Sequence, residues 1–145
     1  MVVLLVGSVM IVATVVIESC FIAIATAVLN HWGSLLSRIS LFLRLIVMLS
    51  GLTLWLLAGI TVALWLWAAL FVALGEFESF FQALYFSSVS ATTLGYGDVT
   101  LSTDWQLLSG LIAANGLVLF SLNTAFLFEA LRRMNDAYEA ESAAS

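Results

Sequence analysis

The most specific chemistry in this sequence is offered by backbone atoms rather than by side chains. Residues 92–98 read Thr-Thr-Leu-Gly-Tyr-Gly-Asp, with two glycines in alternation with larger residues. Alternating glycines permit backbone conformations that are closed to other residues. A run of this kind can present successive carbonyl oxygens, which are ligands able to replace the water around a cation.

A short helix is predicted directly before this run, over residues 79–91. It would reach about 20 Å, roughly half the thickness of a membrane. Glu76, Glu78 and Ser79 at its start suit the positive end of a helix dipole, and Ser79 is the expected N-cap. The negative end then points towards the place where a cation could rest. Since non-helical backbone at membrane depth must be buried in protein or line a water-filled path, we interpret residues 79–98 as a re-entrant pore loop.

The composition places the chain in a lipid bilayer. Hydrophobic residues make up 63% of it and charged residues 9%, against about 45–50% and about 25% in globular proteins. Three stretches without proline are long enough to cross the membrane as helices of about 40–45 Å. They are Val2–Leu29, Leu45–Leu74 and Trp105–Leu131. The first lacks the basic leader of a signal peptide, so we expect it to remain as a helix.

The four arginines predict the orientation of these helices. Arg38 and Arg44 lie between the first two stretches, and Arg132 and Arg133 follow the third. A chain that crosses three times places both regions on one side, which the positive-inside rule assigns to the cytoplasm. We therefore expect a multi-pass protein of the cell membrane with its N-terminus outside and its C-terminus in the cytoplasm. Residues 75–104, which carry acidic but no basic side chains, would lie outside.

The run from Ala91 to Asp98 resembles the potassium-channel signature, in which Thr-Val-Gly-Tyr-Gly is followed by Asp. The resemblance extends from the second apolar stretch through the third, and Trp105 also falls where many simple bacterial channels have a tryptophan. It implies an all-α membrane fold with three transmembrane helices, a re-entrant pore helix and a selectivity filter, assembled as a homotetramer. The expected parts are an extra N-terminal transmembrane helix (1–30), a cytoplasmic linker (31–44), a pore domain (45–131) with outer helix 45–74, pore helix 79–91, filter 92–98 and inner helix 105–131, and a cytoplasmic tail (132–145).

The resemblance also assigns roles within the filter. The carbonyl oxygens of Thr93, Leu94, Gly95 and Tyr96 would bind K⁺ in successive sites, and the Thr93 hydroxyl would complete the innermost one. Gly95 and Gly97 would let these carbonyls face the axis of the pore. Tyr96 would point away from the axis and pack against the pore helix of a neighbouring subunit.

Three residues around the filter depart from the family pattern. Leu94 replaces the commoner valine, and Val89 stands where some bacterial channels have a glutamate that pairs with the filter aspartate. Tyr85 takes the place of a tryptophan that commonly bonds the same aspartate. We predict that the Tyr85 hydroxyl donates a charge-assisted hydrogen bond to Asp98 instead. Thr92 is grouped with these residues as filter support.

The predicted inner helix contains the candidates for the cavity and the gate. Gly116 lies near the usual position of a gating glycine, and close helix packing through a small residue is the alternative interpretation. Polar residues at membrane depth are expected to face the cavity or another helix, and Asn123 and Thr124 are the best cavity candidates. Glu129 would form a ring that concentrates cations or would pair with an arginine one turn on. The polar residues are Asn115, Ser121, Asn123 and Thr124.

Glu18 is the least expected residue, because a charged carboxylate near the bilayer centre costs about 2.5–3.5 kcal/mol on the mildest scale. It should face protein, and Thr61 and Asn123 are expected at comparable depth. We consider Glu18 a candidate proton sensor, against the alternative of a protonated packing residue. Cys20, the only cysteine, is expected to be a small buried hydrophobe.

Other functions lack the residues that they need. No arginine repeats at every third position, so a voltage sensor is not predicted, and gating would depend on an unidentified domain or regulatory subunit. The net charge of −5 without a basic run gives no support to nucleic-acid binding. Catalytic and phosphate-binding arrangements are not found, and K⁺ is the only expected bound species, with no organic cofactor. The alternatives to a potassium channel are a weakly selective cation channel and a non-conducting subunit that modifies other pore chains.

Overall fold

The fold is built from long apolar helices. The computed structural model describes residues 1–32 and 41–143, and these residues contain four helices and no strand. Three of the helices include segments long and apolar enough to cross a membrane, Val2–Leu29, Leu43–Ala73 and Leu107–Asp136. The predicted all-helical arrangement of three long apolar helices and one short helix is therefore confirmed. The helices are α1 (Val2–Trp32), α2 (Leu41–Ala73), α3 (Phe80–Ala91) and α4 (Leu107–Ala143).

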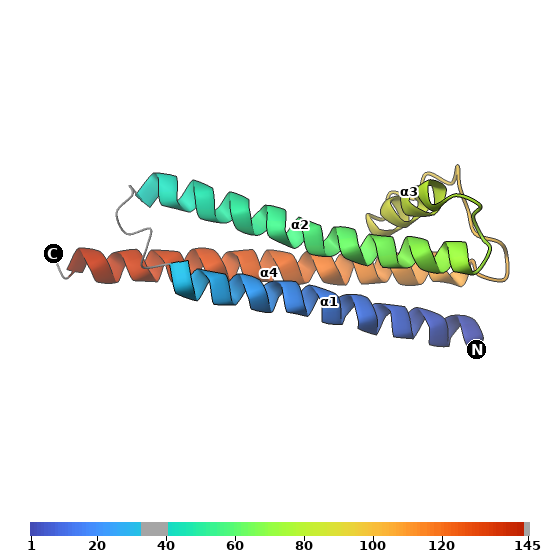
Figure 1. The fold of residues 1–145 in the computed structure, drawn as a ribbon, viewed down its shortest axis with the longest axis horizontal. Helices are drawn as coiled ribbons and strands as arrows, with labels where there is room; N and C mark the ends of the chain where they lie inside the picture. Colours follow the sequence, from blue (N-terminus) through green and yellow to red (C-terminus); the bar gives the residue numbers. More distant parts are fainter. Residues whose placement is uncertain (33–40, 144–145) are drawn as a thin grey trace.

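The three long helices lie side by side, and the short helix packs at one end of them (Figure 1). α1 and α4 run in one direction and α2 runs in the other. The N-terminus of α1 therefore lies at the same end as α3, whereas α4 continues to the opposite end. α3 contacts both α2 and α4, so the segment that follows it is held next to α4.

The helix boundaries differ from the prediction at the end distant from α3. α2 begins at Leu41 rather than at residue 45, so Arg44 belongs to its first turns and is buried. Only part of the predicted linker 31–44 is described, because residues 33–40, among them Arg38, lie outside the described residues. α4 continues through most of the predicted tail, as far as Ala143. Charged pairs one turn apart, such as the Arg133–Glu129 pair at 2.8 Å, favour this helical extension.

A buried aromatic cluster attaches α3 to α2. The ring of Phe71, which is fully buried, packs edge-on against Phe77 and Phe86 with centroids 6.2 Å and 5.2 Å away. Trp67 adds a tilted contact with Phe71 at 5.8 Å. Truncation of a buried phenylalanine to alanine typically costs about 3–5 kcal/mol. This cluster therefore fixes the position from which the run 92–98 starts.

α1 packs along α2 and α4. The indole Nε1 of Trp55 donates a 2.9 Å hydrogen bond to the carbonyl oxygen of Phe21, and the two rings lie 4.9 Å apart. Gly7 sits so close to Leu108 and Leu111 that a larger residue would displace them. The interpretation of Cys20 as a buried residue is wrong, because its side chain is exposed on the surface of α1.

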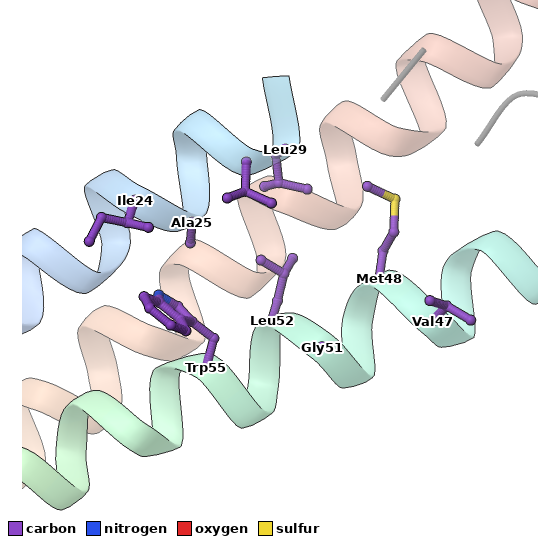
Figure 2. Close-up of a pocket in the computed structure, with 9 residues that line it drawn as sticks. Ile24, Ala25, Leu29, Val47, Met48, Gly51, Leu52 and Trp55 are labelled. Carbon is purple, nitrogen blue, oxygen red and sulfur yellow. The ribbon is translucent and has the colours of Figure 1, made fainter. Parts of the chain in front are cut away.

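An apolar groove of about 380 Å³ separates α1 from α2 in the half of the bundle distant from α3 (Figure 2). Its walls include Ile24, Leu29, Met48 and Leu52, with Trp55 at one end. Every lining residue is apolar or glycine, apart from the indole nitrogen of Trp55. The groove therefore offers no set of ligands for a cation, and it shows that α1 and α2 are not closely packed at this level.

Candidate functional site

The site begins with the N-terminus of α3. Ser79 has an extended backbone, and its Oγ accepts a 3.2 Å hydrogen bond from the backbone nitrogen of Phe81. Ser79 is therefore the N-cap, as predicted. From this cap α3 runs towards the middle of α4, because its last residue, Ala91, lies against Gly116 rather than against the first turn of α4. The C-terminal end of α3 thus lies at the level of the membrane-spanning part of α4.

The run 92–98 starts as the C-terminal cap of α3. The backbone nitrogen of Thr93 donates to the carbonyl of Ser90 at 2.9 Å, and that of Leu94 donates to the carbonyl of Val89 at 3.0 Å. This pair of bonds is the Schellman pattern, which places Thr93 in the left-handed position that glycine usually takes. Thr93 has φ = 60°, and no other described residue except glycine has a positive φ. A β-branched residue in this conformation costs about 1–3 kcal/mol, a strain that is found preferentially at ligand-binding positions.

The glycines of the run have the conformations that their spacing predicts. Gly95 has φ = 55° and Gly97 has φ = 76°, so every second residue from Thr93 onwards is left-handed. A side-chain carbon built on either glycine would meet no atom within 4 Å of the same chain. Backbone conformation rather than space therefore requires glycine at these positions. Leu94 and Tyr96, which alternate with Thr93, Gly95 and Gly97, have side chains that are 59% and 67% exposed.

Tyr85 and Asp98 connect α3 to the end of the run. The Tyr85 hydroxyl donates a 2.7 Å hydrogen bond to Oδ2 of Asp98, which confirms the predicted contact. This bond raises the pKa of Tyr85, because loss of its proton would place two negative charges together. Both residues line a cavity of about 180 Å³ between α3 and the returning chain, and the apolar residue Val89 also lines it.

Replacing Tyr85 with phenylalanine is expected to loosen the run 92–98 while leaving α3 folded. The variant lacks only the hydroxyl that holds Asp98, so the backbone amides of the run should exchange hydrogen faster and the protein should become less heat-stable. Tyr85→Trp is the matched control, because its indole nitrogen can again donate to Asp98. Hydrogen exchange and heat stability equal to those of the wild type in Tyr85→Phe would show that this hydrogen bond does not support the run.

A second connection across the site was not predicted from the sequence. Both carboxylate oxygens of Glu76 accept hydrogen bonds from Ser102, one from its backbone nitrogen and one from its hydroxyl, each at 2.7 Å. The segment that enters α3 is thereby joined to the segment that leaves the run. From the sequence, Glu76 was interpreted only as a favourable charge near the N-terminus of the short helix. Nothing in the sequence indicates that Ser102 contacts Glu76.

Gly116 of α4 lies against the C-terminal end of α3. A side-chain carbon at this position would lie 2.1 Å from the carbonyl oxygen of Ala91. The structure therefore supports the packing interpretation of Gly116. Thr92, the first residue of the run, follows Ala91 directly, and its hydroxyl donates to the Ser88 carbonyl at 2.8 Å.

The polar residues of α4 divide between two environments. Asn115 and Asn123 are buried and face α1, where Nδ2 of Asn115 donates to the hydroxyl of Thr14 at 2.8 Å. Asn123 lies against Glu18, so its side chain is not directed towards a cavity. Thr124 is exposed and stays a predicted cavity residue. Glu129 accepts a 2.8 Å hydrogen bond from Nε of Arg133, the pairing that was the alternative to a ring of charge.

Glu18 lies in the interior of the bundle, as predicted. Its side chain is 0% exposed. The neighbour on α2 is Gly59 rather than Thr61, whose exposed hydroxyl donates to the Leu57 carbonyl. Thr61 is two positions from Gly59 in α2 and so lies at a comparable depth, as predicted, and Asn123 lies against Glu18 itself.

Comparison with known families adds independent information about the same segment. A family model described as "Ion channel" matches residues 59–133, just over half of the chain. The match begins in α2, includes α3 and the run 92–98, and ends in α4. Searches of curated proteins and of solved structures gave no significant match.

Proposed function

Because the chain belongs to the ion channel family, we propose that it is the pore subunit of a potassium-selective channel. Its three apolar helices and its family make it a multi-pass membrane protein. The observation that carries the proposal is the run from Thr93 to Gly97, which follows α3 and alternates left-handed with other backbone conformations. Passive conduction requires no catalytic group and no organic cofactor.

The proposed chemistry is the exchange of water for carbonyl oxygens. K⁺ would lose its hydration shell and bind the carbonyls of Thr93, Leu94, Gly95 and Tyr96 from each of four subunits. The C-terminal end of α3 carries the negative end of the helix dipole and favours a cation nearby. The connections of Tyr85 with Asp98 and of Glu76 with Ser102 would hold the run open at the distances that potassium requires.

A homotetramer is proposed because the site leaves large apolar side chains exposed. Tyr96 is 67% exposed and Phe81 on α3 is 83% exposed, and on α4 Leu117 and Phe128 are 56% and 71% exposed. Contact between neighbouring copies of the chain would cover the exposed apolar side chains near the filter. We further propose that the end of the bundle with α3 faces the outside, as the arginines predict.

The test is potassium flux into liposomes that contain the purified protein, with sodium as the competing ion and barium as the blocker. Barium-sensitive flux that prefers potassium is the expected result. Equal flux of sodium and potassium would replace the proposal with a weakly selective cation channel. Lack of flux from inserted tetramers, restored by co-assembly with another pore chain, would identify a subunit that only modifies other channels.

A further inference from the structure

A buried acidic group connects α1 to the rest of the bundle. Glu18 lies near the middle of α1 and is fully buried, and neither of its carboxylate oxygens has a hydrogen-bond partner among the described residues. A side-chain carbon on Gly59 of α2 would lie 2.7 Å from Oε2 of Glu18. The glycine therefore makes the space that the carboxyl group fills.

The polar side chain that interacts with this carboxyl group is Asn123 of α4. The two groups lie close together without the distance and angle of a standard hydrogen bond, so both polar atoms of Asn123 also lack a partner. Unpaired buried polar groups are rare in native proteins and call for a functional explanation. Here two such groups from different helices face each other.

One turn earlier on α1, the same interface contains a side-chain hydrogen bond. The fully buried hydroxyl of Thr14 accepts a 2.8 Å hydrogen bond from Asn115. Thr14 and Glu18 thus occupy neighbouring turns on one face of α1, and Asn115 and Asn123 face them from α4. Two polar contacts therefore join α1 to α4. The contact of Thr14 with Asn115 is neutral, whereas the contact of Glu18 with Asn123 contains a group that can ionise.

Among the residues that the structure describes, no charged side chain acts on Glu18. On α1 it is the only acidic or basic residue between Val2 and Leu29, and α2 presents Gly59 to it. On α4 the facing residue is Asn123, whereas Glu129 further along is paired with Arg133. An ionised carboxylate is costly when it is buried in the membrane-spanning part of a helix. A neutral carboxyl group, in contrast, can donate a hydrogen bond to the Asn123 amide oxygen after a small adjustment.

We propose that Glu18 is a proton-binding site that controls the packing of α1 on α4. With its proton bound, the carboxyl group stays buried against Gly59 and Asn123 and holds the two helices together. Release of the proton creates a buried charge, which α1 relieves by moving its Glu18 segment away from α4. Beyond Glu18, α1 is held by the hydrogen bond of Trp55 to Phe21 and by the small cluster of Ala25, Leu52 and Ala130, next to the apolar groove between α1 and α2.

The effect on ion flow depends on the proposed channel function, whereas the movement of α1 does not. α4 also carries Gly116, which contacts the end of α3 directly before the run 92–98. Movement of α1 away from α4 would therefore change the support of the proposed pore. Acidic conditions correspond to the packed state, and alkaline conditions correspond to the displaced state.

The movement can be measured with two spin labels on each chain. Cys20 is exposed on α1 and is the only native cysteine, and Val118→Cys, at a 47% exposed position on α4, provides the second site. Labelled protein would be mixed with excess unlabelled Cys20→Ser protein, so that only distances within one subunit are measured. Between about pH 5 and about pH 9, a range that spans the titration of ordinary and buried carboxyl groups, the distance should increase in the protein with Glu18.

Glu18→Gln is the decisive variant, because it keeps the size and hydrogen-bonding ability of the side chain but cannot ionise. Its distance should not change with pH, and an unchanged pH response in this variant would overturn the proposal, since other groups would then be responsible. If Glu18→Gln does not fold, Asn123→Leu is the second variant, because it removes the polar partner of Glu18. It should move the pH midpoint of the distance change, and an unmoved midpoint would also overturn the proposal. A distance change without any ion flux would contradict only the channel assignment.

Discussion

Replacing Gly116 with alanine is expected to abolish potassium flux. The added carbon would lie 2.1 Å from the Ala91 carbonyl oxygen, and its next contacts at 2.7 Å and 2.9 Å are also backbone atoms of Ala91. Backbone at the end of a helix cannot rotate away as a flexible side chain can. α3 and α4 must therefore separate, and overpacking of this kind costs about 1–3 kcal/mol or more in each subunit. Because residues 92–98 follow Ala91 directly, the displacement reaches every position proposed to bind K⁺.

Gly110→Ala is the matched control for this prediction. Gly110 also lies in α4, but a carbon added there meets no atom within 4 Å, so flux and heat stability should stay close to those of the wild type. The packing interpretation predicts that Gly116→Ala lowers heat stability together with flux. A variant that loses flux but keeps its full stability would instead support the hinge interpretation, and one that retains both would contradict the contact between α3 and α4.

Some features could be predicted from the sequence because they depend on neighbouring residues or on a fixed spacing along the chain. Ser79 was recognised as an N-cap because capping depends on neighbouring residues. The bond between Tyr85 and Asp98 was predicted because the resemblance fixes the spacing between the short helix and the filter. The left-handed conformations of Gly95 and Gly97 followed from the residue type itself. None of these predictions required the rotation of one long helix against another.

The rotation of each long helix about its own axis could not be predicted. The wrong predictions concern residues whose surroundings depend on that rotation. α1, α2 and α4 are strongly apolar within their membrane-spanning segments, and their few polar residues do not form a continuous face that shows which side is buried. Depth along the helix placed Asn123 near Glu18, but it could not separate Gly59 from Thr61, which lie on different faces of α2. For the same reason Cys20 was assigned to the interior and Asn123 to the cavity. Gly59 and Gly116 become recognisable only when their neighbours are known.

Replacing Gly95 with alanine should remove selective flux without unfolding the bundle. Gly95 has φ = 55°, and an L-residue in the left-handed region costs roughly 1–2 kcal/mol. In a tetramer this strain occurs in four copies around one axis and amounts to roughly 4–8 kcal/mol in total. The strain is relieved when the carbonyls of Leu94 and Gly95 turn away from the ion. Liposome flux with potassium and sodium should show loss of potassium preference or of all flux, whereas the melting temperature of the helices should change little.

Thr93→Gly provides the contrast, because Thr93 already has a positive φ and glycine would relieve its strain. The backbone of this variant should be more stable, but the hydroxyl proposed to complete the innermost ion site is lost. We therefore expect weaker barium block with retained flux. If Gly95→Ala conducts and selects as the wild type does, the left-handed conformation at residue 95 is not needed for conduction. Such a result, together with unchanged barium block in Thr93→Gly, would remove the run 93–97 from the conduction path.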